Sequence, residues 1–295
     1  MWKNITIQDI KNRMKYLKAF NYAGTKYRIL DQIFQYFPKD IKILVEPFVG
    51  SGSVFLNTDA EYYIINDSRL EIYAFWYSIF HNIETLKNTV DKFNCKFKEN
   101  KQKYFQLRDL HNKNLKTKNL NDIAATFYIL TNTCINGHCR WNNKDEFNQA
   151  WGNRNCTNNI LELKPIFEKL QGKIKIFNKD YTFLFRKILD RYKNKLNDFF
   201  FYCDPPYFIQ PGAHKWSDTN EKNLYFHLNK INNIGSKFCL SNIISTNNVK
   251  EENNIIKTEL KQYNVIDIAI NYNSGTKNKI RNSGNKTREI LVKNF

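Results

Sequence analysis

Residues 199–207 read FFFYCDPPY, and this stretch decides the fold of the chain. Its first five residues, 199–203, form a continuous apolar and aromatic run, which is typical of a strand buried on both faces in a parallel sheet. Pro205 and Pro206 end the strand because proline donates no hydrogen bond to a sheet ladder. The two prolines also make the turn rigid, so we predict that the Asp204 carboxylate is fixed at the edge of the sheet.

Similar short apolar runs recur along the chain and indicate further strands. They are residues 43–48, 62–65, 238–240, 265–270 and 289–292. Helical patterns fall between several of the strands, for example at residues 183–196 and 220–233. Strands separated by helices predict an α/β sheet with helices on both faces.

The stretch from residue 68 to about residue 175 departs from this alternation. Its helix-like segments are residues 72–93, 98–112 and 120–134, and the Gly-containing, aromatic-rich piece that follows, residues 136–152, suits a β-hairpin. We predict that residues 68–175 form an inserted, mostly helical subdomain. Residues 1–67 and 176–295 then form the α/β core.

The charge of the chain favours a polyanionic partner. The sequence has 46 Lys and Arg against 28 Asp and Glu, a formal net charge of +18. Neutralisation of phosphates is the usual reason for such an excess, although basic side chains can also simply face water. Because no apolar run reaches the ~20 residues that span a bilayer, and none near the N-terminus suits a signal peptide, we expect a soluble cytoplasmic protein without membrane contact.

The six cysteines include no CxxC pair. Cys134, Cys139 and Cys156 lie near one another, with His138 among them, but their spacing fits no compact zinc motif. We therefore expect free thiols and no bound metal.

Two features at predicted strand ends suit a nucleotide-like ligand. The run at residues 43–48 leads into Gly50-Ser51-Gly52, where glycine lets the backbone turn sharply and approach a ligand closely. Asp67 ends the next strand, a position from which a carboxylate can accept hydrogen bonds from both hydroxyls of a ribose. Taken alone, the first feature is equally an ordinary strand-to-helix turn, and Asp67 is equally a helix N-cap.

The turn at residues 204–207, which we call the acidic turn, suits chemistry on an exocyclic amine. If Asp204 and the Pro205 carbonyl accept hydrogen bonds from both amine hydrogens, the nitrogen becomes pyramidal and its lone pair can attack a methyl sulfonium. The Tyr207 ring is expected to stack on a planar base. The alternative is a structural Asp-Pro turn with a surface tyrosine.

Several segments, taken in order, resemble the motifs of the Dam-type DNA adenine-N6 methyltransferases, the alpha or D12 class. The matching segments are NYAGTK (21–26), FVGSG (48–52), Asp67, NKD (178–180) and DPPY (204–207). The segments CRWN (139–142), FN (147–148) and WG (151–152) resemble the DNA-reading hairpin of that family, and SN (241–242) and RE (288–289) resemble late motifs. The resemblance covers nearly the whole chain.

The resemblance implies a Rossmann-like methyltransferase core with an inserted target-recognition subdomain, and S-adenosylmethionine as the cofactor. The implied reaction transfers a methyl group to N6 of a flipped adenine in double-stranded DNA. Cofactor contacts are implied for Tyr22 and Lys26 (methionine end), Phe48, Gly50, Asp67 (ribose), Asp180 (adenine amine) and Asp204. Contacts with the target base are implied for Asp204, Pro205, Pro206 and Tyr207, and contacts with DNA for Asn136, His138, Arg140 and Asn142.

The chain also departs from the family pattern. Thr25 stands where many relatives carry glycine, and the hairpin has His138 for leucine and Ala150 for proline. Because two of these changes fall in the recognition element, a GATC-like target is one option and not an inherited property. Methylation of cytosine N4, and a non-catalytic DNA-binding protein that retains the fold, are the alternatives. We expect a monomer of bacterial or viral origin.

Overall fold

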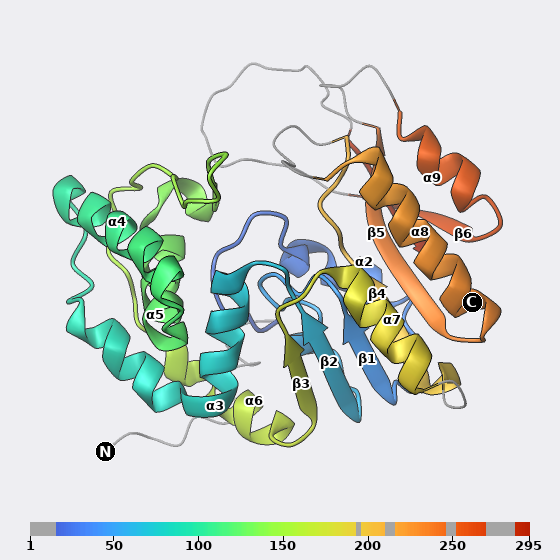
Figure 1. Ribbon diagram of the computed structural model, residues 1–295, viewed down its shortest axis with the longest axis horizontal. Helices are drawn as coiled ribbons and strands as arrows, with labels where there is room; N and C mark the ends of the chain where they lie inside the picture. Colours follow the sequence, from blue (N-terminus) through green and yellow to red (C-terminus); the bar gives the residue numbers. More distant parts are fainter. Residues whose placement is uncertain (1–15, 193–195, 210–215, 246–251, 270–286) are drawn as a thin grey trace. The chain divides into compact units, whose positions relative to one another are not determined.

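The computed structural model describes residues 16–192, 196–209, 216–245, 252–269 and 287–295 (Figure 1). The strands are β1 (Ile43–Glu46), β2 (Tyr62–Asn66), β3 (Ile174–Phe177), β4 (Phe199–Cys203), β5 (Lys237–Ser245), β6 (Asn264–Ile268) and β7 (Arg288–Lys293). The α-helices are α2 (Leu30–Phe34), α3 (Leu70–Lys92), α4 (Lys101–Thr117), α5 (Leu120–Thr133), α6 (Lys164–Leu170), α7 (Tyr181–Arg191), α8 (Asp218–Asn233) and α9 (Asn254–Glu259). Short 3-10 helices are Lys26–Ile29, Phe55–Asn57, Ile135–Gly137, Ile160–Leu163 and Leu196–Asp198.

The described strands form a seven-stranded sheet in the order β3-β2-β1-β4-β5-β7-β6. β4 pairs in parallel with both β1 and β5. β7 lies between β5 and β6 and runs antiparallel to both. This mixed, mostly parallel sheet with helices confirms the predicted α/β class.

β4 has the double-sided burial that its sequence predicts. All five of its residues are buried. The Phe201 ring stacks on Phe185 of α7, with ring centroids 5.3 Å apart, whereas Phe200 contacts Phe37 edge-on at 4.7 Å. Successive strand residues point to opposite faces of a sheet, so these two contacts cover both faces of β4. Figure 1 shows α7 and α8 side by side on one of these faces.

The chain divides into two compact units. The first comprises Met1–Arg28, Val49–Asp59 and Ile65–Lys179, and the second comprises Ile29–Phe48, Ala60–Ile64 and Asp180–Phe295. The assignment of residues 68–175 to target recognition, and of residues 1–67 and 176–295 to the catalytic core, stays a prediction.

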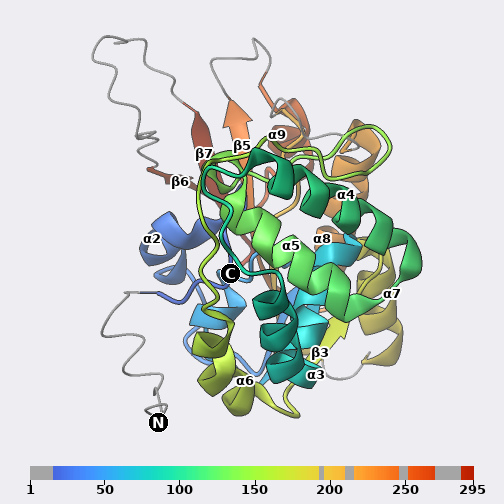
Figure 2. The ribbon, with the colours of Figure 1, turned by 90° about the vertical axis from the view of Figure 1, so that its left-hand side faces the viewer.

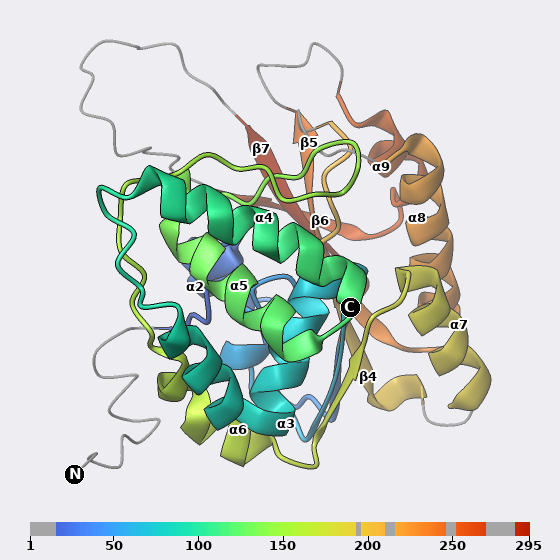
Figure 3. The ribbon, with the colours of Figure 1, turned by 60° about the vertical axis from the view of Figure 1, so that its left-hand side comes forward.

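Three long helices, α3, α4 and α5, dominate the first unit and correspond to the three predicted helical segments. Figures 2 and 3 show α4 and α5 alongside each other. Every residue from 123 to 131 of α5 is buried, which explains its apolar composition. α4 begins after Asn100, whose side chain accepts a hydrogen bond from Lys103 N, and extends five residues past the predicted end at residue 112.

The predicted hairpin is present as antiparallel bridges that join Cys134 to Trp151 and Trp141 to Phe147. The 3-10 turn Ile135–Gly137 interrupts the pairing because Asn136 takes a left-handed conformation, with φ 57°. We call residues 134–152 the recognition hairpin below, after the DNA contacts that the sequence predicts for them. β3 is the strand that the sequence did not predict, because it has only four residues and none of them is fully buried.

Among the residues that the structure describes, no helix is both long and apolar enough to cross a membrane. Within the same ranges, no cluster of three or more His, Cys, Asp or Glu side chains is arranged to hold a metal ion.

Gly52 provides a test of packing in the first unit. With φ +70°, an added Cβ would lie 2.4 Å from Phe55 Cε1 and 2.5 Å from Trp76 Cζ2. Both rings are buried, so we expect Gly52→Ala to lower the free energy of unfolding by about 3 kcal/mol in urea titrations.

Gly24→Ala is the matched control. Gly24 also has a positive φ, +77°, but no described heavy atom lies within 4 Å of an added Cβ. In this variant the free energy of unfolding should fall by only about 1 kcal/mol, the cost of a left-handed backbone conformation for alanine. Equal losses for the two variants would contradict the packing argument.

Candidate active site

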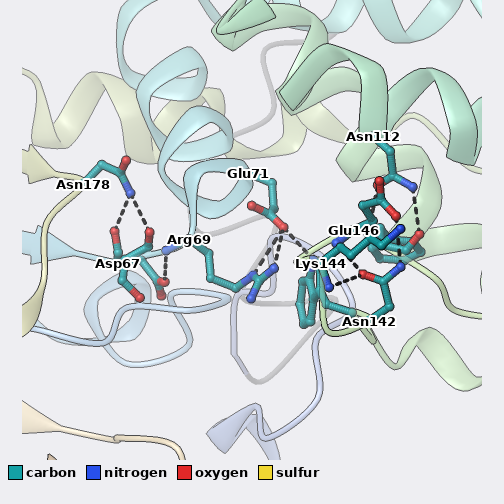
Figure 4. A network of polar contacts seen from close by, with 11 residues as sticks. Asp67, Arg69, Glu71, Asn112, Asn142, Lys144, Glu146 and Asn178 are labelled. Carbon is teal, nitrogen blue, oxygen red and sulfur yellow. Dashed lines mark hydrogen bonds and ion pairs between the residues drawn. The ribbon is translucent and has the colours of Figure 1, made fainter. Parts of the chain in front are cut away.

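Asp67 follows β2, and two backbone N–H groups hold its carboxylate. Gly50 N donates to Oδ2 at 3.0 Å. Arg69 N donates to Oδ1, also at 3.0 Å (Figure 4). Burial raises the pKa of Asp67 to about 6, against the lowering effect of these two hydrogen bonds. Each carboxylate oxygen has two lone pairs, so both can accept a further hydrogen bond from a ligand. The N-cap of α3 is Arg69, so Asp67 is not the helix cap that was its alternative interpretation.

Hydrogen bonds hold the turn Gly50-Ser51-Gly52, which we call the glycine turn, next to this carboxylate. Val49 N donates to Asn66 O at 2.8 Å, and Trp76 Nε1 donates to Gly50 O at 3.0 Å. The Tyr22 ring lies beside the turn, since a Cβ added to Gly50 would be 3.4 Å from Tyr22 Cε1. The predicted cofactor residues Tyr22, Gly50 and Asp67 are therefore close together in the first unit.

Thr25 directly precedes the first 3-10 helix, and Lys26 is the first residue of that helix. Lys26 is only 5% exposed, and its Nζ donates to Gly24 O at 3.2 Å. The Thr25 hydroxyl lies 2.6 Å from Ser53 Oγ and 3.2 Å from Ser51 Oγ. Thr25, the departure from the family pattern, therefore ties this segment to the glycine turn.

The segment after β3 is attached to the same turn. Asn178 Nδ2 donates to Asp67 O at 2.8 Å and to Ser68 O at 3.0 Å (Figure 4). Asn66 exchanges hydrogen bonds with the backbone N and O of Lys179.

Asp180 begins the second unit. It is exposed and caps α7, with its Oδ1 accepting from Thr182 N at 2.9 Å. Its implied contact with a cofactor amine stays a prediction.

In the second unit, Asp204 stands where β4 ends. Tyr207 Oη lies 3.0 Å from Asp204 Oδ1 and 3.0 Å from Glu289 Oε1 of β7. Burial, and then the two carboxylates, raise the pKa of Tyr207 well above its usual range, so the phenol keeps its proton. The phenol has one proton, so at any moment Tyr207 donates to Asp204 or to Glu289 and not to both.

The exposure of the turn differs from residue to residue. Tyr207 is 6% exposed and Pro205 is buried, whereas Pro206 is exposed and Asp204 is partly exposed. The predicted stacking of Tyr207 on a base stays a prediction, because little of its ring faces outward. Asp204 is the one partly exposed ionisable residue of the turn.

Phe48 belongs to an aromatic cluster in the second unit. Its ring centroid lies 5.2 Å from that of Tyr181 and 5.6 Å from that of Trp216, and these two rings are 5.5 Å apart. Phe48 and Trp216 are partly exposed. Such a cluster suits a planar heterocycle, because aromatic faces and edges pack favourably on one another.

A buried carboxylate holds Trp216 in this cluster. Glu221 is 0% exposed, and its Oε2 accepts from Trp216 Nε1 at 2.9 Å. Its Oε1 accepts from Tyr225 Oη at 2.8 Å, Asn242 Nδ2 at 3.0 Å and Asn253 Nδ2 at 2.9 Å. Trp216 and Glu221 have no role among the predictions made from the sequence. The signal available was the capping box Ser217–Asn220, which marks the start of α8 beside both residues.

The predicted DNA-binding residues lie on the recognition hairpin. Asn136, His138 and Arg140 are exposed. Asn142 instead forms the hairpin turn, because its Oδ1 accepts from Lys144 N and Glu146 N at 2.9 and 3.0 Å and its Nδ2 donates to Glu146 Oε2 at 3.0 Å. Contact of all four residues with DNA stays a prediction, and Asn142 has a structural role beside it.

Comparison with known proteins identifies a family. The model of the D12 class N6 adenine-specific DNA methyltransferases matches residues 22–290. This range includes every residue for which a catalytic, cofactor or DNA contact is predicted.

Individual relatives agree with the family match. Modification methylase StsI of Streptococcus sanguinis is 28% identical over 315 residues, covering 99% of this chain and 44% of that protein. Type II methyltransferase M.MjaIII of Methanocaldococcus jannaschii is 32% identical, covering 75% of this chain and 82% of that protein. The DNA adenine methylase of Serratia marcescens is 31% identical, covering 66% and 68%. The chain thus spans less than half the length of the StsI relative and most of the length of the other two.

Glu221 allows the architecture of the second unit to be tested without an activity assay. Glu221→Gln places an amide N–H₂ group against side chains that donate hydrogen bonds. We expect a loss of about 2–4 kcal/mol in the free energy of unfolding, because buried donors lose their acceptor. Asp218→Asn, on the exposed side of the same helix, should change stability by less than about 0.5 kcal/mol. A loss below about 1 kcal/mol for Glu221→Gln would contradict the organising role of this carboxylate.

Proposed function

We infer, because the chain belongs to the D12 class of N6 adenine-specific DNA methyltransferases, that it transfers a methyl group from S-adenosylmethionine to the N6 amine of adenine in double-stranded DNA. The observation that carries the proposal is the Asp204–Tyr207 turn at the end of a fully buried strand. The turn offers a rigid carboxylate and carbonyl where a planar base can approach. Cytosine N4 would be the competing acceptor at such a turn.

The residues present fit the chemistry of S-adenosylmethionine. In the first unit, Asp67 offers acceptors for the ribose hydroxyls, and the buried Lys26 offers a cation for the methionine carboxylate. Tyr22 and Gly50 line the same turn. In the second unit, Phe48 and its aromatic neighbours suit the adenine ring, and Asp180 suits the adenine amine. When bound, the cofactor supplies an electrophilic methyl group on a sulfonium.

The chain's own residues would prepare the amine of the target adenine. Asp204 and the Pro205 carbonyl would accept hydrogen bonds from the two N6–H groups. These hydrogen bonds withdraw the nitrogen lone pair from conjugation with the ring. Tyr207, through its hydroxyl, keeps the Asp204 carboxylate in one orientation. Preorganised acceptors of this kind lower the barrier because they need no rearrangement during the reaction.

DNA would be engaged by the recognition hairpin. Arg140 suits a bidentate contact with guanine or a contact with phosphate, and Asn136 and His138 are exposed beside it. The target adenine would leave the stack to reach Asp204, since its amine is otherwise paired within the duplex. The recognition sequence then depends on the hairpin side chains, with GATC as one candidate.

Removal of the carboxylate of the turn tests the proposal. We expect Asp204→Ala to reduce kcat at least about 100-fold in an assay with labelled S-adenosylmethionine and a mixed-sequence duplex, because one acceptor of the reacting amine is lost. Asp198→Asn, at the start of β4 in a surface ion pair with Lys42, should stay within about twofold of wild type. Equal label transfer by Asp204→Ala and wild type would overturn the role of Asp204. Digestion of the product should yield N6-methyladenine; N4-methylcytosine would overturn the assignment of the base.

Asp67 predicts a pH dependence of cofactor binding. Its pKa of about 6 means that the carboxylate is ionised, and a full acceptor, above pH 6 and protonated below it. The Kd of S-adenosylmethionine should therefore rise about tenfold between pH 7 and pH 5, if the protonated form binds poorly. Calorimetric titrations of Asp67→Asn should show weaker binding without this step near pH 6. A step of the same size in the variant would assign the titration to another group.

A further inference from the structure

We propose that Arg69 and Glu71 are positioning residues that connect the cofactor site to the recognition hairpin, so that cofactor and DNA each strengthen the binding of the other. The inference rests on the proposed function for the identity of the two ligands. It adds a physical link between their sites, built from described contacts within the first unit (Figure 4).

The link begins at Asp67. Its Oδ1 accepts from Arg69 N at 3.0 Å, so the backbone of Arg69 is held by the carboxylate that is proposed to bind the ribose. Asn178 fixes the same turn from the opposite side through Asp67 O. A ligand that orders the Asp67 carboxylate must therefore also order the backbone from which the Arg69 side chain extends.

The link continues through one oxygen atom. Glu71 Oε1 accepts from Arg69 Nε and Nη2 at 3.3 and 3.2 Å and from Trp141 Nε1 at 2.6 Å. Glu71 is only 3% exposed, which shields these interactions from water and counterions. Glu71 thus joins α3 to the recognition hairpin by a short, buried, charge-assisted hydrogen bond.

The indole ring of Trp141 makes cation–π and aromatic contacts in addition to the hydrogen bond from its Nε1. The Arg69 guanidinium carbon lies 3.7 Å from the centroid of the indole ring, in cation–π contact. The Phe147 ring meets the indole edge-on at 6.0 Å, and Tyr22, a predicted cofactor residue, lies 6.4 Å away. Trp141 therefore contacts the cofactor site by two routes, directly through Tyr22 and indirectly through Arg69.

Movement of Trp141 would carry the predicted DNA contacts with it. Trp141 lies between Arg140 and Asn142 in sequence, and Asn142 closes the hairpin turn with its own side chain. The opposite strand of the hairpin is held separately. Asn112 of α4 donates to Phe147 O at 3.0 Å and accepts from Phe147 N at 2.8 Å. Asn112 therefore holds the hairpin through the backbone of Phe147, the bridge partner of Trp141, and not through Arg69 or Glu71.

Shared ordering gives the coupling its physical basis. When the first ligand orders Asp67, Arg69 and Trp141, the second ligand binds to a segment that is already ordered. Thermodynamic linkage makes the effect reciprocal, and couplings of this kind typically change affinity about 5- to 150-fold.

Hydrogen exchange of the recognition hairpin tests the link without requiring catalysis. Saturating S-adenosylhomocysteine, a cofactor analogue with no methyl to transfer, should slow exchange of residues 139–149 in the wild type. In Glu71→Ala the same residues should exchange faster and should not respond to the analogue, although the analogue still binds. Trp141→Phe, which removes the indole N–H donor and one ring but keeps an aromatic side chain, should also lose most of the response and guards against misfolding of Glu71→Ala.

Asn112→Ala is the matched control, because it loosens the hairpin outside the link. Its hairpin should exchange faster than in the wild type but still respond to the analogue. A purely structural role for Glu71 predicts that Glu71→Ala behaves like Asn112→Ala, and that result would overturn the proposal. An unresponsive hairpin in wild type that binds the analogue would also overturn it.

Duplex binding gives the second readout. The ratio of Kd values for a mixed-sequence duplex without and with the analogue should be about 5- to 150-fold in the wild type and close to one in Trp141→Phe. A ratio in Trp141→Phe equal to that of the wild type would contradict the link. Failure of the wild type to bind the analogue at all would instead refute the proposed function, and this inference with it.

Discussion

β4 is buried along its whole length, and this burial decides where charged chemistry can occur. A carboxylate inside such a strand would lose its hydration at a cost on the order of several kcal/mol unless new partners replaced the water. Asp204 therefore stands at the first position where the chain leaves the sheet, and Pro205 prevents the strand from continuing. The same constraint applies to Asp67, which ends β2 and whose lost water is replaced by two backbone N–H groups.

Much of the fold could be predicted from sequence because burial leaves a local pattern. The apolar runs at β1, β2 and β4 were located to within two residues, and the three long helices of the first unit, α3, α4 and α5, were identified as helices, whereas α6 was not predicted. β3 was missed because none of its four residues is buried and the exposed Lys175 interrupts its apolar run. The ends of α4 and α7 differ from the predicted ends, since the residues that stop a helix leave weaker signals than those that start one.

The candidate site was predictable only where its residues adjoin a motif. Asp67 and Asp204 end strands, and the glycine turn is visible in the sequence itself. Glu289 and Glu221 were not assigned roles, because their partners are distant in sequence: Tyr207 lies 82 residues before Glu289, and Asn242 lies 21 residues after Glu221. Glu71 follows Asp67 closely, yet its contact with Trp141 spans 70 residues and depends on how the hairpin packs. Contacts of this kind become visible only in three dimensions.

The position of β7 between β5 and β6 imposes an order on the folding of the chain. During synthesis by the ribosome, β5 and β6 emerge first, yet the strand that separates them follows both. Until residue 288 is available, their facing edges have no partner, and open strand edges are sites of aggregation. The last strand also brings Glu289 to Tyr207. A nascent chain can thus form the contact between Tyr207 and Glu289 only after β7 has emerged.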